Sequence, residues 1–267
     1  MEEYLIAVIM GIVEGLTEFL PVSSTGHMIL TADLLGFEGD VAKTFEVVVQ
    51  LGAVLAVLVL YWKRYMGILN DFFRFDFKRK NKLNAIHMII AMAPAGILGI
   101  SLSGFIKDYL FGASTVLIGL VIGGVLMIVA EKANRKITSE HSDDITYKQA
   151  FGIGLFQCLA LWPGFSRSGS TMAGGLLFGT SRQAAADFTF MISVPIMLGA
   201  TGIDLYQSRD FLTGDDLLLF MIGLATSFIV AMIAVVTFLN LIKRLSLTWF
   251  AIYRFVLAAA FYFLVMY

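Results

Sequence analysis

Long apolar runs alternate with short polar segments along the whole chain. A transmembrane helix needs about 17–25 predominantly apolar residues at a rise of about 1.5 Å per residue. Uninterrupted runs of this kind cover residues 45–62, 85–105, 114–130, 183–206, 217–242 and 247–266. We therefore predict that these six segments are full transmembrane helices.

Two further apolar runs, residues 4–35 and 151–179, are each interrupted by residues that stop a helix. Pro21 and the sequence S-S-T-G interrupt the first run, and W-P-G-F-S-R-S-G-S-T interrupts the second. Backbone that leaves a helix at membrane depth needs protein or a water-filled cavity around it. We therefore expect each run to form a re-entrant helical hairpin. The alternative for the first run is a plain transmembrane helix with a polar kink.

The lysine and arginine residues give the predicted helices an orientation, because basic loops stay on the cytoplasmic side. The two most basic loops, 63–82 and 131–148, are separated by two spans and so share one side with Lys243 and Arg244. The opposite side receives Lys43, Lys107, Asp204, Arg209, Asp210, Asp215 and Asp216. This asymmetry requires both interrupted runs to return to the side that they came from. The sequence thus predicts an all-α polytopic membrane protein with six transmembrane helices, two re-entrant hairpins and both termini outside.

The two halves of the chain resemble each other. Leu34, Gly36, Ala42 and Phe45 recur 143 residues later as Leu177, Gly179, Ala185 and Phe188. We predict one membrane domain, 1–267, with repeats at about 1–130 and 149–267 joined by a polar linker, 131–148. Three crossings per repeat would invert the second copy, and inverted repeats bring broken-helix tips together near the bilayer midplane. The alternative is that short apolar matches recur by chance.

Composition agrees with a membrane protein. Of the 267 residues, 58% are hydrophobic and 15% are charged, whereas soluble domains average about 45–50% and about 25%. The net charge of −1 leaves no basic face for a nucleic acid. The single cysteine, Cys158, excludes an internal disulfide. Because the first apolar run carries Glu2 and Glu3 rather than basic residues, we expect no removable signal peptide.

The first interruption, E-G-L-T-E-F-L-P-V-S-S-T-G-H, places acids where charged groups are costly. Glu14 and Glu18 are four residues apart and would share one face of a helix. Two carboxylates so placed repel each other unless one is protonated or a cation lies between them. Oxygen ligands of this kind suit Mg²⁺ or Ca²⁺, which often complete their shells with phosphate oxygens. The alternative is a water-exposed helix face that tolerates acids.

Hydroxyl groups and a histidine follow these acids. Ser23, Ser24 and Thr25 can cap a helix or bind phosphate oxygens. His27 lies within about a turn of them, which favours general acid–base or nucleophilic chemistry over a purely structural role. His87 and His141 have no such neighbours, so we assign them no role.

The second interruption surrounds one arginine with small and hydroxyl side chains, a composition typical of an anion cradle. Arg167 lies among Ser166, Ser168, Ser170 and Thr171. A guanidinium group binds phosphate through two parallel hydrogen bonds and stays charged when poorly hydrated. Alternatively, Arg167 pairs with Glu14 or Glu18, which would not prevent a functional role. Together the two tips predict a site for a phosphorylated substrate that enters from lipid.

These two motifs resemble the signature motifs of bacterial undecaprenyl-diphosphate phosphatase, the bacitracin-resistance protein family. The similarity extends through F-E-V-V-V-Q-L-G, F-Q-C-L-A-L-W-P-G and A-I-Y-R-F. The resemblance implies dephosphorylation of the C55 polyprenyl diphosphate carrier lipid at the outer face of the bacterial cytoplasmic (inner) membrane. That reaction recycles the carrier for peptidoglycan synthesis, and sequestration of the diphosphate by bacitracin explains the resistance phenotype.

The resemblance also implies roles for single residues. The acids of the family motif correspond to Glu14 and Glu18, its histidine to His27, its serine to Ser24 and its phosphate-binding arginine to Arg167. The attacking group stays open between Ser24, a water molecule and His27, and we favour His27 supported by Glu18.

Two rival functions and one structural question also stay open. Inverted repeats with midplane tips are a transporter architecture, so the protein could instead flip the lipid phosphate. Membership of the phosphatidic-acid phosphatase superfamily is disfavoured, because no histidine follows Ser166 and Arg167 at catalytic spacing. The oligomeric state is open, and a homodimer is one possibility.

Overall fold

The computed structural model describes residues 2–37, 39–75, 82–110, 112–133, 135–207 and 217–266. These residues are overwhelmingly helical, and the described ranges contain no strand, only an isolated bridge between Ser139 and Thr180. The predicted all-α class is therefore confirmed for this part of the chain.

The helices follow the predicted apolar runs closely. The first half consists of α1 (Glu2–Thr17), α2 (Ser24–Leu35), α3 (Asp40–Leu60), α4 (Trp62–Phe73), α5 (Ala85–Ser101), α6 (Ser103–Phe105), a π-helical turn (Ile106–Leu110) and α7 (Ala113–Lys132). After a short 3-10 turn (Ser142–Asp144), the second half consists of α8 (Tyr147–Gln157), a 3-10 turn (Cys158–Leu161), α9 (Arg167–Leu177), α10 (Arg182–Gln207), α11 (Leu217–Leu241), α12 (Leu247–Phe261) and a π-helical turn (Tyr262–Met266). Both interrupted runs are thus broken into two helices at the predicted motifs.

Within the described ranges, five helical segments are long and apolar enough to cross a membrane. They lie at Val41–Leu60, Ala113–Lys132, Arg182–Asp204, Leu217–Leu241 and Leu247–Val265. The sixth predicted span is not straight, because α5 ends at Ser101 and the chain continues over Ser103–Leu110 at an angle of 73°. Ser103 Oγ donates a hydrogen bond to the carbonyl of Ile100 at 3.1 Å, which competes with the helical ladder at this bend. The part of the chain that the structure describes therefore contains five helices able to cross a membrane, or six if the bent pair crosses as one.

The first predicted basic loop contains a helix that the apolar pattern alone did not predict. Helix α4 covers Trp62–Phe73 and buries Tyr65 and Ile68 on one face. Tyr65 donates a hydrogen bond from its hydroxyl to the carbonyl of Met191 in α10, at 2.9 Å. The segment is therefore an amphipathic helix docked on the bundle. Residues 76–81 of this loop lie outside the described residues, as do Arg209, Asp210, Asp215 and Asp216 of the opposite side.

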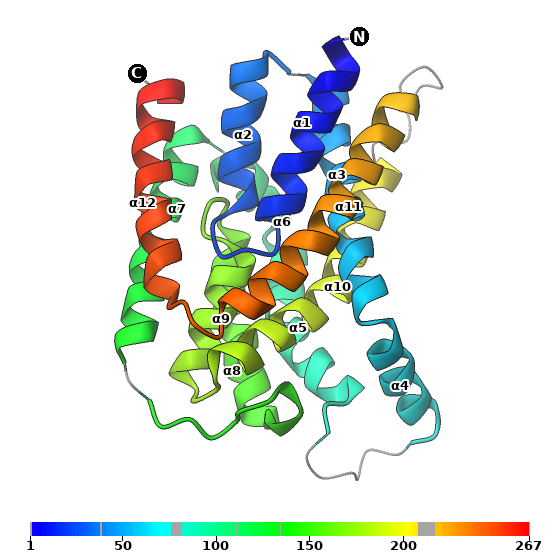
Figure 1. Cartoon of the computed structure of the whole chain (residues 1–267), viewed down its shortest axis with the longest axis vertical. Helices are drawn as coiled ribbons and strands as arrows, with labels where there is room; N and C mark the ends of the chain where they lie inside the picture. Colours follow the sequence, from blue (N-terminus) through cyan, green and yellow to red (C-terminus); the bar gives the residue numbers. More distant parts are fainter. Residues whose placement is uncertain are drawn as a thin grey trace.

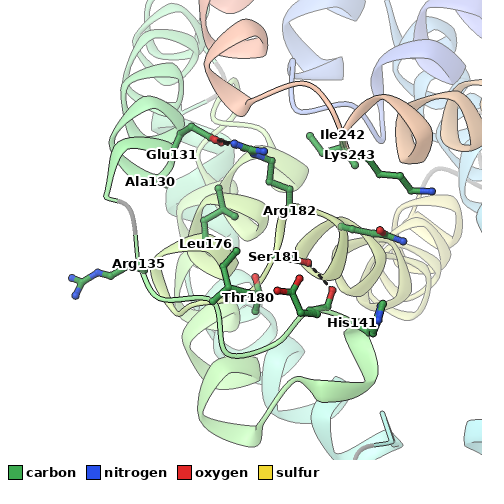
Figure 2. A pocket seen from close by; sticks show the side chains of 13 residues that line it. Ala130, Glu131, Arg135, His141, Leu176, Thr180, Ser181, Arg182, Ile242 and Lys243 are labelled. Atoms are coloured by element: carbon green, nitrogen blue, oxygen red, sulfur yellow. Dashed lines mark hydrogen bonds and ion pairs between the residues drawn. The ribbon is translucent and has the colours of Figure 1, made fainter.

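The arrangement of the loops agrees with the predicted sides. In Figure 1 both chain termini lie at one end of the molecule, and α4 and the segment before α8 lie at the other. Arg64 and Asp143, one from each basic loop, form an ion pair with an N–O distance of 2.6 Å. Lys243 lines a pocket with Arg135 and Arg182 (Figure 2). The three basic segments therefore share one end.

Glycines allow α11 to pack closely against α1 and α3. A Cβ atom on Gly52 would lie 2.4 Å from the carbonyl oxygen of Leu224, and one on Gly11 would lie 2.7 Å from that of Gly223. Gly15 meets the carbonyl of Ser227 in the same way, at 2.7 Å. Because lipid tails are as apolar as leucine, such close backbone contact is a main source of attraction between membrane helices.

Gly52→Ala should therefore destabilise the protein by about 1–3 kcal/mol, because the added methyl group overlaps a backbone atom that cannot move alone. Gly96→Ala in α5 is the matched control, since no atom lies within 4 Å of its Cβ position. That change should be neutral or stabilising by up to about 1 kcal/mol. Unfolding of both variants in detergent would measure the difference, and equal stability would contradict the packing described.

Candidate active site

The break between α1 and α2 is held open by Ser23. This residue has a φ of 72°, a conformation that non-glycine residues rarely adopt. Its hydroxyl accepts a hydrogen bond from the backbone N–H of Gly26 at 3.4 Å and so caps α2. The capped start of α2 directs Ser24 and Thr25 toward a cavity described below.

The break before α9 repeats this turn 143 residues later. Ser166 also has a φ of 72°, and its hydroxyl accepts a hydrogen bond from the backbone N–H of Gly169 at 3.2 Å. The preceding Gly164 has a φ of 87°, and a Cβ atom there would lie 2.2 Å from the carbonyl oxygen of Val116. Only glycine therefore fits this position against α7.

The two breaks meet each other. Figure 1 shows α1 and α2 in the upper part of the molecule and α8 and α9 in the lower part, with the breaks between them. Arg167 Nη2 lies 2.7 Å from Glu18 Oε1, and the Ser168 hydroxyl donates to the carbonyl of Leu20 at 2.8 Å. The side chains of Arg167 and Glu18 are only 15% and 6% exposed. The pairing considered as the alternative for Arg167 is therefore present, and its partner is Glu18.

A cavity of about 210 Å³ lies at this junction. Six of the predicted site residues line it: Glu18, Ser23, Ser24, Thr25, Ser166 and Arg167. Its other lining residues include Gln50, Trp162 and Met197. Gln50 is a polar residue inside an apolar run, a signal that was available in the sequence, whereas nothing in the sequence pattern indicated Met197.

Arg167 keeps a donor free for a ligand. Its Nη2 donates to Glu18 and lies 2.9 Å from the sulfur of Met197, and its guanidinium carbon lies 5.7 Å from the ring centre of Phe19. Its Nη1 is buried and makes no hydrogen bond within the described part of the chain. A buried, unsatisfied donor costs about 1–3 kcal/mol, so an anion that accepts from Nη1 gains a prepared partner.

Ser24 is aligned with Glu18. Its hydroxyl donates to Glu18 Oε2 at 2.5 Å, while the other carboxylate oxygen accepts from Arg167. A serine hydroxyl is a weak nucleophile until a base next to it takes its proton. Glu18 occupies the position of such a base.

His27 is not among the residues that line this cavity. Its Nδ1 lies 2.8 Å from the carbonyl oxygen of Ser23, and its Nε2 lies 2.7 Å from the hydroxyl of Tyr253. A carbonyl only accepts, so Nδ1 carries a proton, and in a neutral ring Nε2 accepts from Tyr253. The two rings are also stacked, with centroids 5.6 Å apart. The structure thus places His27 behind the Ser23 turn rather than among the lining residues.

Two predicted substrate-binding residues make internal hydrogen bonds. Ser168 is 1% exposed and donates to the carbonyl of Leu20 in the first break. Thr171 is fully buried, and its hydroxyl donates to the carbonyl of Arg167 at 2.8 Å. The structure therefore places both behind Arg167, where they fix the start of α9.

The carboxylates offer part of a cation site. Glu14 is 3% exposed, and Glu18 and Glu46 are close enough to interact with its carboxyl group electrostatically. Within the described ranges, no group of three His, Cys, Asp or Glu side chains is arranged to hold a metal ion. Mg²⁺ is commonly held by one or two carboxylates together with substrate phosphates and water. Both oxygens of Glu18 are hydrogen-bonded to Ser24 and Arg167, and Glu14 is not among the residues that line the cavity, so the Mg²⁺ or Ca²⁺ site stays a prediction.

A second pocket, of about 370 Å³, lies near the end of the molecule with the basic loops (Figure 2). Arg182 donates to Glu131 there, and Glu131 also accepts from the backbone N–H of Leu247. Its lining residues include none of the predicted site residues. The cavity at the two breaks is therefore the candidate active site.

Comparison with known families identifies the family of the chain. The model of the family described as bacitracin resistance protein BacA matches residues 7–260, so it covers both breaks and all the helices between them. The chain belongs to the BacA family. This is a family of undecaprenyl-pyrophosphate phosphatases, which supports a membrane hydrolase acting on a diphosphate. The multi-pass character expected of such a BacA protein agrees with the apolar helices described above.

Inorganic phosphate should raise the melting temperature of the purified protein by a few degrees at about ten times its Kd, because it binds only the folded state. Arg167→Ala should remove this increase, since Arg167 is the cation among the lining residues. Arg182→Ala, in the other pocket, should keep it. The quantity compared between the variants and the parent is the rise in melting temperature on addition of phosphate, not the absolute melting temperature. An equal effect in Arg167→Ala and the parent would contradict phosphate binding here.

Proposed function

We propose that this BacA protein hydrolyses undecaprenyl diphosphate to undecaprenyl phosphate and inorganic phosphate, recycling the carrier for peptidoglycan synthesis and conferring bacitracin resistance. The observation that carries the proposal is the contact of Glu18 with both Ser24 and Arg167 at the edge of a cavity. A base, a hydroxyl and a phosphate-binding cation thus lie within hydrogen-bond reach of one another. The family match supplies the substrate class.

The membrane arrangement that we propose has two re-entrant hairpins, α1–α2 and α8–α9, within an inverted repeat. Equivalent turns support this proposal: Ser23 and Ser166 share a φ of 72°, and Gly36 and Gly179 have φ values of 62° and 83°. Each pair is separated by 143 residues. The packing follows the same repeat, because the first helix of each hairpin packs against a helix of the other half: α1 against α11, and α8 against α5. The site would then lie near the midplane and open toward the outer face of the bacterial cytoplasmic membrane.

Arg167 would bind the terminal phosphate. Nη1 is available as it stands, and a phosphate oxygen that replaces Glu18 at Nη2 would complete a two-bond contact. The same guanidinium offsets negative charge on the phosphoryl oxygens during transfer. A Mg²⁺ or Ca²⁺ ion held by Glu14 and Glu18 would add positive charge at those oxygens.

Ser24 is the attacking group that the geometry favours. Its oxygen would bond to the terminal phosphorus as its proton passes to Glu18, and the bond between that phosphorus and the bridging oxygen would break. Undecaprenyl phosphate leaves, and water then hydrolyses the phosphoserine, so that one water molecule is consumed overall. A water molecule next to Glu18 that attacks the phosphorus directly would give the same products.

His27 would hold the Ser23–Ser24 turn in place rather than attack the phosphorus itself. Its Nδ1–H donates to the carbonyl of Ser23, the residue with the unfavourable φ, and Tyr253 occupies its other nitrogen. These contacts support the proposal that His27 holds the Ser23–Ser24 turn in place, and the nucleophilic role favoured from sequence stays untested. Lipid flipping without hydrolysis has no comparable support, because the family is a phosphatase family.

Purified protein should release phosphate from undecaprenyl diphosphate, and Glu18→Gln and Arg167→Ala should each reduce kcat/KM by at least about 100-fold. A chelator should stop release if Glu14 and Glu18 hold a cation, and added Mg²⁺ or Ca²⁺ should restore it. Liposomes that report lipid sidedness and phosphate together separate hydrolysis from flipping. Flipping without phosphate release by the parent would refute the proposal.

His27→Asn should separate a supporting role from a chemical one. The asparagine amide nitrogen can occupy nearly the place of Nδ1 and donate to the Ser23 carbonyl, but it is neither a base nor a nucleophile. Phosphate release should therefore persist in His27→Asn, within about ten-fold of the parent, while His27→Ala is inactive. If both variants are folded and lose activity equally, His27 acts as a base or nucleophile, and the supporting role is contradicted.

A further inference from the structure

Arg254, in α12, is a fully buried arginine with no acid beside it. Its side chain is 0% exposed, and none of the ion pairs among the described residues includes it. Its hydrogen bonds go to backbone carbonyl oxygens: Nε to Leu120 (3.1 Å), Nη2 to Gly119 (3.0 Å) and Gly164 (2.8 Å), and Nη1 to Phe165 (2.8 Å). The remaining donor of Nη1 points to the sulfur of Met127, at 3.8 Å. All five N–H donors of the guanidinium are therefore used.

These bonds join two elements that are distant in sequence. Two of the carbonyls belong to α7, and two belong to the turn that leads into α9. Carbonyls in a turn have no helical partner, so the guanidinium satisfies groups that would otherwise be buried and unpaired. Arg254 thus clamps the turn against α7.

Glycines in α7 make room for this clamp. A Cβ atom on Gly123 would lie 2.4 Å from Arg254 Nη2 and 2.6 Å from the carbonyl oxygen of Phe165. One on Gly119 would lie 2.5 Å from the carbonyl oxygen of Pro163. The surface of α7 is therefore shaped to receive both the turn and the guanidinium.

The clamped turn directly precedes the phosphate-binding arginine. Phe165 is followed by Ser166, whose φ of 72° persists only where the surrounding structure enforces it. Arg167 comes next, so the carbonyls held by Arg254 determine where its guanidinium lies in the cavity.

The four carbonyl contacts explain why an arginine rather than an apolar residue lies at this position, because its removal would leave buried acceptors without a donor. Lysine has three donors and no planar fork, so it cannot reach four carbonyls on two elements. The neighbouring Tyr253 contacts His27 of the other break, so adjacent residues of α12 hold both halves of the site.

We infer that Arg254 is a positioning residue for phosphate transfer, which sets the place of Arg167 through the carbonyls of Gly164 and Phe165. The inference rests on the proposed function for its effect on the reaction, but the geometry of the turn can be measured without any reaction. Trp162 lines the same cavity and anchors the turn by donating from Nε1 to the carbonyl of Thr115, at 2.8 Å. It therefore reports the position of the turn.

The experiment uses full-length protein in which Trp62 and Trp249, both exposed, are phenylalanine, so that Trp162 is the single tryptophan. Arg254→Lys is compared with Arg182→Lys, an equivalent change at an arginine outside the site. Arg254→Lys should increase quenching of Trp162 by acrylamide about two-fold or more and reduce kcat/KM for undecaprenyl diphosphate at least about ten-fold. Arg182→Lys should change neither. Arg254→Gln, whose single amide group cannot donate to both α7 and the turn, should act like Arg254→Lys, and it provides the test if Arg254→Lys does not fold.

Each outcome has one meaning. Parallel changes in quenching and kcat/KM support the inference. Unchanged quenching, or changed quenching with normal kcat/KM per folded molecule, overturns it, even if the melting temperature falls. If the parent does not hydrolyse the diphosphate, the proposed function is refuted by the parent alone, independently of the Arg254 variants. In that case, the fluorescence of Trp162 and the phosphate-induced rise in melting temperature decide whether Arg254 positions an anion site. If Arg254→Lys changes neither quantity, a positioning role for Arg254 is overturned as well.

Discussion

The ion pair between Glu18 and Arg167 is the interaction on which the rest of the structure depends. Both charges lie inside an apolar bundle, and each offsets part of the free-energy cost of burying the other. Removing one partner of a buried pair typically costs about 3–5 kcal/mol, because the other charge is left without compensation. Since the two residues lie 149 positions apart, the pair also fixes the two breaks relative to each other. A phosphate that competes for Arg167 would release Glu18 from this contact, so binding the substrate and freeing the base become one event.

The surroundings of the pair are built to hold two unfavourable turns. Ser23 and Ser166 both have positive φ values, and each caps the helix that follows it. His27 supports the first turn through its carbonyl, and Arg254 supports the second through the carbonyls before it. Strained backbone of this kind persists only where neighbouring contacts enforce it, and it is concentrated at functional sites. Much of the polar chemistry in the core therefore serves to place Ser24 and Arg167.

Much of this arrangement could be predicted from the sequence, because spans and helix breaks depend on local patterns. Apolar length predicted the helices, and Pro21 and Gly164 marked the two breaks. The bend after Ser101 and the docked helix α4 were missed, since they depend on hydrogen bonds and packing that apolar length does not report. The motifs named Arg167, Glu18 and Ser24 as candidates, and these residues line one cavity. The motifs did not predict that His27 contacts Tyr253, because spacing along a helix does not determine what the opposite helix presents. In the sequence, Arg254 was noted only as part of A-I-Y-R-F. Its contacts with the turn before Arg167 could be identified only in the folded structure.

We propose that neither half of the chain contains a complete site. The most direct measurement is phosphate release from undecaprenyl diphosphate by residues 1–134 and residues 135–267, expressed as separate chains, alone and together. Each half alone should be inactive, and coexpression should restore release, because Glu18 and Ser24 come from one half and Arg167 and Arg254 from the other. Release by a single half at a rate near that of the intact chain would contradict this account.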